Sequence, residues 1–143
     1  MAILERNDTG AVAHLHMNAP ERLNALSDEM IAALQDQFDT LKEDSSIRAV
    51  ILSGAGKAFC AGHDLKEMTA GRQAEDGGKA YFKDLFERCS KMMLSIQSMP
   101  QPVIAQAHGI ATAAGCQLVA SCDMAVAAQG TRFGVNGVNI GLF

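Results

Sequence analysis

Residues 49–68 read AVILSGAGKAFCAGHDLKEM, and residues 102–121 read PVIAQAHGIATAAGCQLVAS. Each stretch passes from a short apolar run, through a bend rich in glycine and alanine, into a segment with helical character. A short apolar run bounded by turn residues is typical of a buried strand. The chain therefore contains a repeated strand–turn–helix unit, which favours an α/β fold over a sandwich or a helix bundle.

The segments around these two units predict further strands and helices. Ser27 is a favourable N-cap ahead of an apolar stripe with helical spacing. A glycine-containing loop is expected at 69–78. No linker or low-complexity segment divides the chain, so residues 1–143 are expected to form one domain. Strands are predicted at 2–7, 11–17, 49–52, 102–105 and 124–127, and helices at 28–43, 76–98 and 112–121.

The composition is that of a globular protein, with 48% hydrophobic and 20% charged residues and a net charge of −4. Twelve Lys and Arg against sixteen Asp and Glu provide no basic stripe, so no nucleic-acid partner is expected. No apolar run approaches the roughly 18 residues of a membrane helix. The N-terminal residues lack the features of a signal or transit peptide, so we expect a cytoplasmic protein.

The four cysteines show no C-x-x-C spacing, so neither a redox pair nor a zinc site is indicated and no metal is expected. Cys60 and Cys116 lie in the two bends, but a nucleophilic role would need a base that the sequence does not identify. Phosphate-binding motifs fail as well. The glycines of Gly54-Ala55-Gly56 lack the third glycine of a dinucleotide motif, and no serine elbow of the G-x-S-x-G type is present.

The two bends suggest an oxyanion hole. A helix N-terminus leaves backbone N–H groups unpaired and carries partial positive charge. Small residues allow a ligand oxygen to approach that backbone closely. Two such bends facing one another would offer two donors to one oxygen, each worth about 3 kcal/mol in a transition state. Glycine- and alanine-rich turns also serve simply as packing devices, so the pattern by itself leaves both readings open.

Five short strings carry a resemblance to a known family. They are Asn24-Ala25-Leu26, AFCAGHDLKEM at 58–68, PVIA followed by Gly109, Gly115-Cys116-Gln117-Leu118, and Ser121-Cys122-Asp123. In this order and at this spacing, the chain resembles the crotonase (enoyl-CoA hydratase/isomerase) superfamily over nearly its whole length. The resemblance implies a crotonase-like spiral of ββα units. It also implies a coenzyme A thioester as substrate, no separate cofactor, and a homo-oligomer of three or six subunits.

Carried over by position, the resemblance implies that the backbone N–H groups of His63 and Ala114 form the oxyanion hole. It implies that Arg22 and Lys66 are partners for the anionic end of CoA, although ordinary surface charge is the alternative for both. The substrate-binding set that it implies is Arg22, Ala61, His63, Asp64, Leu65, Lys66 and Ala114.

Two family glutamates are missing from this sequence. Family hydratases carry one directly after the Gly-Cys pair, where this chain has Gln117, and a second where this chain has Gly137. An amide or a glycine cannot exchange a proton at neutral pH, so poor hydratase activity is expected. His63 and Asp64 are the nearest ionisable candidates. Some acyl-CoA decarboxylases of the family resemble this chain in their Ala-Gly-His-Asp string, although His63 could instead contribute only its N–H.

Two functional hypotheses follow. The first is an acyl-CoA lyase or isomerase of fatty acid metabolism, with enolate chemistry other than efficient hydration. The second is a catalytically silent CoA-binding or assembly module. The resemblance also implies that residues up to Phe143 stop before the family's C-terminal helices. We therefore expect exposed apolar surface and self-association.

Overall fold

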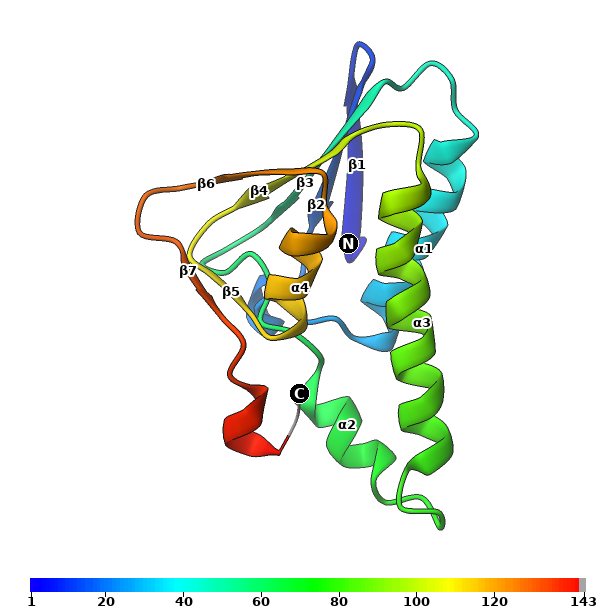
Figure 1. The fold of residues 1–143 in the computed structure, drawn as a ribbon, viewed down its shortest axis with the longest axis vertical. Coiled ribbons are helices and arrows are strands. Elements are labelled where there is room, and N and C mark those ends of the chain that lie inside the picture. Colours follow the sequence, from blue (N-terminus) through cyan, green and yellow to red (C-terminus); the bar gives the residue numbers. More distant parts are fainter. Residues whose placement is uncertain (142–143) are drawn as a thin grey trace.

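The computed structural model describes residues 1–141, which form two sheets with the long helices packed on one side (Figure 1). The strands are β1 (Leu4–Thr9), β2 (Val12–Met17), β3 (Ala49–Gly54), β4 (Val103–Ala107), β5 (Ile110–Thr112), β6 (Met124–Ala127) and β7 (Arg132–Gly134). The helices are α1 (Asp28–Lys42), α2 (Leu65–Gly71), α3 (Lys79–Ser98) and α4 (Ala114–Ser121), with two short 3₁₀ helices, η1 (Pro20–Arg22) and η2 (Gly137–Ile140).

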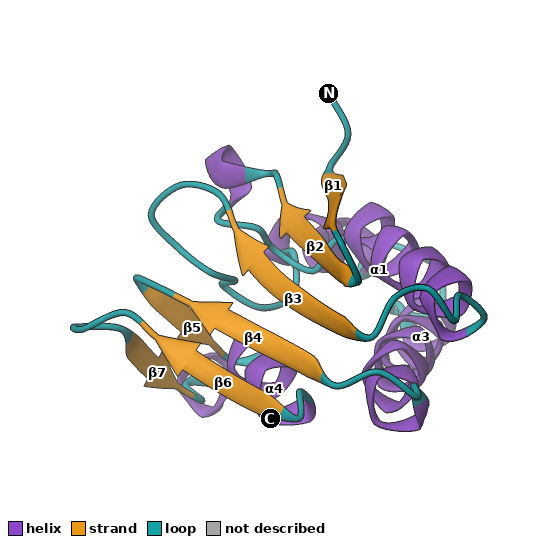
Figure 2. Ribbon diagram, turned by 90° about the horizontal axis from the view of Figure 1, so that it is seen from above, coloured by secondary structure: helices purple, strands orange, loops and turns teal. Residues whose placement is uncertain are grey.

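The larger sheet has the strand order β1-β2-β3-β4-β6, and only the β1–β2 pair is antiparallel. The smaller sheet pairs β5 with β7, and Cys60 extends it through a parallel bridge to Ala111 (Figure 2). The same order of elements therefore occurs three times along the chain: a strand of the large sheet, then a strand or bridge residue of the small sheet, then a helix. The three sets are β3, Cys60 and α2; β4, β5 and α4; and β6, β7 and η2. This confirms the repeated unit and its ββα form.

Helix α1 forms as predicted. The Ser27 hydroxyl accepts a hydrogen bond from the N–H of Met30 at 3.1 Å, which satisfies one of the unpaired donors of the first turn. The apolar stripe of α1 is buried against the sheet and against α3. Its buried residues are Met30, Ile31, Leu34, Phe38 and Leu41.

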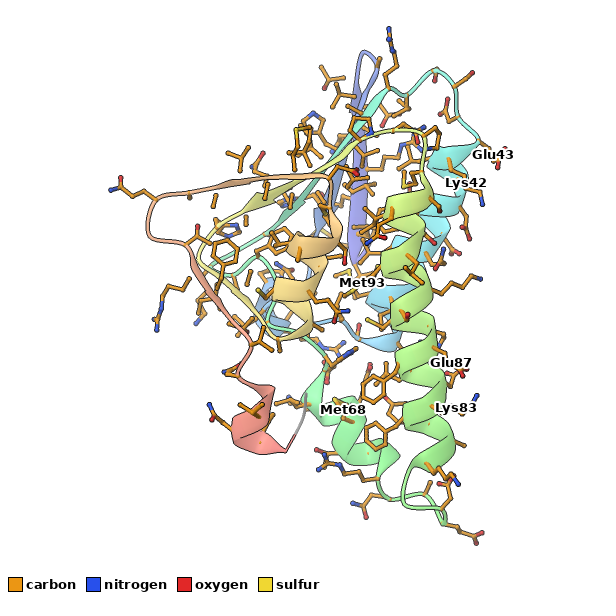
Figure 3. The ribbon with its side chains drawn as sticks, viewed as in Figure 1. Lys42, Glu43, Met68, Lys83, Glu87 and Met93 are labelled. Carbon is orange, nitrogen blue, oxygen red and sulfur yellow. The ribbon has the colours of Figure 1, made fainter. Side chains whose placement is uncertain are left out.

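Helix α3 has one inward and one outward side. Met93 points toward the sheet and is buried, whereas Lys83 and Glu87 lie on the outer side, where their charged groups pair at 2.6 Å (Figure 3). The helix begins at Lys79 rather than at the predicted 76. Asp76 lies before it, and its carboxylate accepts hydrogen bonds from the N–H groups of Gly78 and of Ala80 in the first turn. The loop predicted at 69–78 is shorter than expected and covers only residues 72–78, because α2 extends to Gly71.

Strand β2 alternates as predicted. Ala13, Leu15 and Met17 are fully buried, and the two histidines occupy the other face. His16 Nδ1 lies 2.8 Å from the hydroxyl oxygen of Ser53 on β3. Across residues 1–141, no cluster of three or more His, Cys, Asp or Glu side chains could hold a metal ion. Within the same residues, no helix is long and apolar enough to cross a membrane.

Apolar side chains are exposed on two parts of the surface. One lies on α2 and α3, and the other covers β6, which is an edge strand with all four residues exposed, and the segment after it. An apolar sheet edge is a template for association. Apart from Met1, the exposed large apolar residues are Leu65 on α2, Phe86 and Leu94 on α3, and Met124, Val126, Phe133, Val135, Val138 and Ile140.

We expect the 143-residue chain to self-associate through the apolar surface of β6 and the segment after it, because contiguous exposed apolar patches promote association. Sedimentation velocity at several concentrations measures it. The double substitution Met124→Lys and Val126→Lys is expected to shift the distribution toward smaller species, whereas Lys42→Glu on α1 serves as the charge-changing control. A monodisperse monomer at all concentrations would show that this surface does not drive association.

Candidate active site

A buried asparagine organises the chain that leads to the first bend. Asn24 is fully buried and has a left-handed backbone, with φ of 51°. Its side-chain oxygen accepts from the N–H of Ala19, and its amide nitrogen donates to the carbonyls of Ala55 and Ala58, each at 2.9 Å. Asn24 thus ties together the turn after β2 and the loop after β3. Its sequence motif contributed to the resemblance, but this structural role could not be read from it.

The segment after Asn24 pairs with the first bend by backbone hydrogen bonds. The N–H of Ala61 donates to the carbonyl of Leu23 at 3.1 Å, and the N–H of Leu26 donates to the carbonyl of Gly62 at 2.7 Å. The peptide between Gly62 and His63 is therefore held through its carbonyl. Its N–H, on His63, is left for another acceptor.

The two bends are in direct contact. A Cβ placed on Gly62 would lie 3.1 Å from the Cβ of Ala113 and 3.3 Å from the nitrogen of Ala114. A Cβ on Gly115 would lie 2.1 Å from the carbonyl oxygen of Cys60, so only glycine allows this approach. The β3 and β4 units are thus joined where each enters its helix, as the hypothesis of two facing bends requires.

Ala113 adopts a backbone conformation that L-residues rarely adopt, with φ of 51° and ψ of −125°. Such conformations cost roughly 1–3 kcal/mol and cluster at functional sites. The N–H of Ala113 is hydrogen-bonded to the carbonyl of Gly134 at 2.8 Å, which helps to hold it. The next N–H along the backbone belongs to Ala114, which is the first residue of α4.

The N–H groups of His63 and Ala114 share a further property. Within residues 1–141, neither donates a hydrogen bond to another protein group. Both residues line the same cavity, which has a volume of about 650 Å³. Unpaired backbone donors at a helix start are suited to an anionic or polarised oxygen. The arrangement can therefore present two donors to a ligand in this cavity.

The cavity is formed by α2, α3, α4 and the segment around η2. Four of the predicted substrate-binding residues line it, together with Gln117 and Gly137, the positions where the resemblance implies glutamates. Met68 and Phe86 also line it, and the sequence did not indicate either of them as a site residue. The lining residues are Ala61, His63, Leu65, Met68, Phe86, Thr112, Ala113, Ala114, Cys116, Gln117, Ala120, Val135, Asn136, Gly137, Asn139 and Ile140.

No carboxylate and no permanent cation belongs to this lining set, in which only His63 and Cys116 carry titratable side chains. Burial lowers the pKa of His63 below its ordinary value, so its imidazole is neutral at pH 7. Its Nδ1 atom is buried and has no hydrogen-bond partner within residues 1–141, and the ring meets Phe86 edge-to-face with centroids 5.6 Å apart. The thiol of Cys60 lies in the core, where burial raises its pKa to about 12.

The other three predicted substrate-binding residues do not line the cavity. Asp64 is buried and is the N-cap of α2, because its Oδ1 accepts from the N–H groups of Lys66 and Glu67 at 3.0 and 3.1 Å. Arg22 donates from Nε to Asp64 Oδ2 at 3.0 Å, and its charge is therefore engaged within the protein. Lys66 is exposed and forms no ion pair among residues 1–141.

A family model described as enoyl-CoA hydratase/isomerase matches residues 7–143. The chain belongs to this family. The match covers both bends and the cavity-lining positions. Together with the structural likeness described next, family membership confirms the crotonase-like α/β fold that the sequence motifs predicted.

Several members of the family resemble the chain closely. The crystal structure of an enoyl-CoA hydratase from Mycobacterium smegmatis superimposes with a TM-score of 0.92 at 55% identity, covering 99% of this chain and 53% of that one. Enoyl-CoA hydratase domain-containing protein 3, mitochondrial, from Xenopus laevis is 46% identical over 132 residues, which are 92% of this chain and 43% of the relative. Mouse Delta(3,5)-Delta(2,4)-dienoyl-CoA isomerase, mitochondrial, is 35% identical over 136 residues and is covered to 42%.

The chain thus spans about half or less of the length of these relatives. Two of them carry the word mitochondrial in their names, so the expected cytoplasmic location of this chain is not confirmed and stays a prediction.

Proposed function

We propose that the cavity binds an acyl-CoA thioester. The carbonyl oxygen of the thioester would accept hydrogen bonds from the N–H groups of His63 and Ala114. The observation that carries the proposal is a pair of N–H groups that have no protein acceptor within residues 1–141. They lie on two bends that touch each other and line one cavity. The names of the relatives, which include hydratases and an isomerase of CoA esters, support this class of ligand.

The chemistry that this arrangement favours is enolate formation. Breaking a bond at the carbon next to a thioester carbonyl places negative charge on the carbonyl oxygen. Two preorganised N–H donors stabilise that charge, and each is worth roughly 2.7–4 kcal/mol in comparable sites. The start of α4 adds the positive end of its helix dipole near Ala114. Lys66, exposed at the start of α2, is our candidate for contact with the anionic part of CoA.

The cavity lacks the carboxylates that a hydratase uses for proton transfer, among the lining residues that the structure describes. Hydration requires a base for water and an acid for the carbon, and the cavity presents Gln117 and Gly137 where the family places its glutamates. We therefore propose a lyase or isomerase reaction that relies on the enolate rather than on paired carboxylates. Among the lining residues that the structure describes, the imidazole of His63 is our candidate base, although burial lowers its pKa.

A catalytically silent CoA-binding module is the second candidate, and the absence of lining carboxylates favours it. Proton exchange separates the two. An active enolate site exchanges the methyl protons of acetyl-CoA with solvent deuterium, which NMR detects directly. Binding without exchange, both for acetyl-CoA and for longer acyl esters, would support the silent module.

Bulky substitutions in the cavity provide the binding test. Ala61→Leu and Ala114→Leu are each expected to weaken acetyl-CoA binding at least about tenfold, because the added side chain fills the space beside the N–H groups. Isothermal titration calorimetry measures the Kd. Ala32→Leu, on the exposed face of α1, makes the same chemical change away from the cavity and is expected to leave binding unchanged. Equal affinities for all three variants and the wild type would place the ligand elsewhere.

A further inference from the structure

Arg22 lies at the end of η1 and contacts two carboxylates of α2. Its guanidinium donates to Asp64 through Nε and Nη2 and reaches Glu67 Oε1 from Nη2 at 3.4 Å. Asp64 is only 7% exposed, and a buried carboxylate needs a partner because its desolvation is costly. The two carboxylate oxygens of Asp64 have different partners. Oδ1 accepts hydrogen bonds from the two N–H groups at the start of α2, and Oδ2 accepts from the Arg22 guanidinium.

The same contacts continue into the helix layer. Glu67 Oε2 accepts from the N–H of Asp28 at the start of α1, at 2.8 Å. The Asp28 carboxylate in turn accepts from Arg88 of α3 at 2.7 Å. A chain of hydrogen bonds, which passes through both the backbone N–H and the carboxylate of Asp28, therefore connects η1, α2, α1 and α3. Arg22 and Asp64 form the end of this chain that lies next to the first bend.

His63 lies between two fixed points. On one side the Gly62 carbonyl is held by Leu26, and on the other side Asp64 is held by Arg22. The His63 N–H lies in the plane of the peptide that joins Gly62 to His63. The Gly62 carbonyl fixes this peptide at one end, and the anchored Asp64 limits where the Cα of His63 can lie at the other end. Arg22 itself is not among the residues that line the cavity.

We infer that Arg22 is a positioning residue for the first oxyanion donor, acting through Asp64 to hold the backbone that carries the His63 N–H. This rests on the proposed function of that N–H. It replaces the expectation that Arg22 contacts the anionic end of CoA, because a phosphate would have to displace two carboxylates from the guanidinium. Arg22 thus acts on the acyl end of the ligand and not on the nucleotide end.

Three ligands separate these two roles, measured by calorimetry on the 143-residue chain: acetyl-CoA, S-acetyl-pantetheine, which lacks the nucleotide phosphates, and free CoA, which lacks the acyl carbonyl. A positioning role predicts that Arg22→Ala weakens acetyl-CoA and S-acetyl-pantetheine by the same factor, about three- to tenfold, and leaves free CoA unchanged. Weakened acetyl-CoA and free CoA with unchanged S-acetyl-pantetheine would identify a phosphate contact and overturn the inference. Unchanged affinity for all three ligands would also overturn it.

Two variants test the route through Asp64. Asp64→Asn keeps a good N-cap side chain but removes the charge that pairs with Arg22, so it is expected to reproduce the Arg22→Ala pattern. Arg6→Ala removes a comparable guanidinium that pairs with Asp8 and Asp44 away from the bends, and it is expected to leave all three affinities unchanged. If Arg22→Ala fails to fold, the three affinities are measured for Arg22→Lys instead, and the same pattern is expected with smaller changes in Kd.

A ligand-free measurement distinguishes failure of this inference from failure of the proposed function. Wild-type protein that binds none of the three ligands would refute the proposed function alone. The amide resonances of His63 and Ala114 then decide the positioning role: Arg22→Ala is expected to shift the His63 resonance and leave that of Ala114 in place. An unchanged His63 resonance would overturn the inference.

Discussion

Crotonyl-CoA hydration by this chain is expected to be roughly 10⁴-fold slower than by a family member with both glutamates. Each positioned acid or base contributes roughly 10²–10⁴-fold to a rate. This chain has Gln117 and Gly137 at the two positions, and both line the cavity. The loss of enoyl absorbance measures the rate. Turnover comparable to that of an authentic hydratase would contradict our account of the site.

Restoring the carboxylates provides the converse experiment. Gln117→Glu combined with Gly137→Glu is expected to raise the hydration rate by about 100-fold or more, because both proton-transfer groups are then present in the cavity. The matched control is Gln117→Asn, which retains an amide and is expected to leave the rate unchanged. A double variant that stays inactive while still binding acetyl-CoA would show that the remaining geometry cannot support hydration.

Gly115→Ala is expected to reduce the free energy of unfolding by roughly 3 kcal/mol. The new Cβ would lie 2.1 Å from the carbonyl oxygen of Cys60, and this atom belongs to the backbone rather than to a flexible side chain. The two bends would have to separate, so the variant is also expected to lose acyl-CoA binding. Urea denaturation followed by circular dichroism measures the stability.

Gly134→Ala is the matched control. Gly134 lies on β7, its φ is not positive, and a Cβ there would meet no atom within 4 Å. Its stability is expected to stay within about 0.5 kcal/mol of the wild type. Equal stability of the two variants would mean that the contact between Gly115 and Cys60 is not a close one.

The elements that the sequence predicted well are those decided by local interactions. Ser27 caps α1 through a hydrogen bond to Met30 three residues later, and the stripe of α1 follows from helical spacing. The alternation along β2 likewise decided which face is buried. Strands β5 and β7 were not predicted, because three residues carry too little pattern and each strand depends on its partner.

The amino-acid sequence by itself determined the repeated strand–turn–helix unit, the family, and the identity of Gln117 and Gly137 at the positions where the family resemblance implies glutamates. Each of these depends on residue identity at short spacing. Only the tertiary structure decided that Arg22 meets Asp64, which is 42 residues away, and that Phe86 of α3 packs edge-to-face against His63. Such contacts form where helices pack on the sheet, and the packing places side chains together without leaving a periodic signal in the chain. The same packing leaves the N–H groups of His63 and Ala114 without a partner among residues 1–141, beside a cavity that can receive an oxygen.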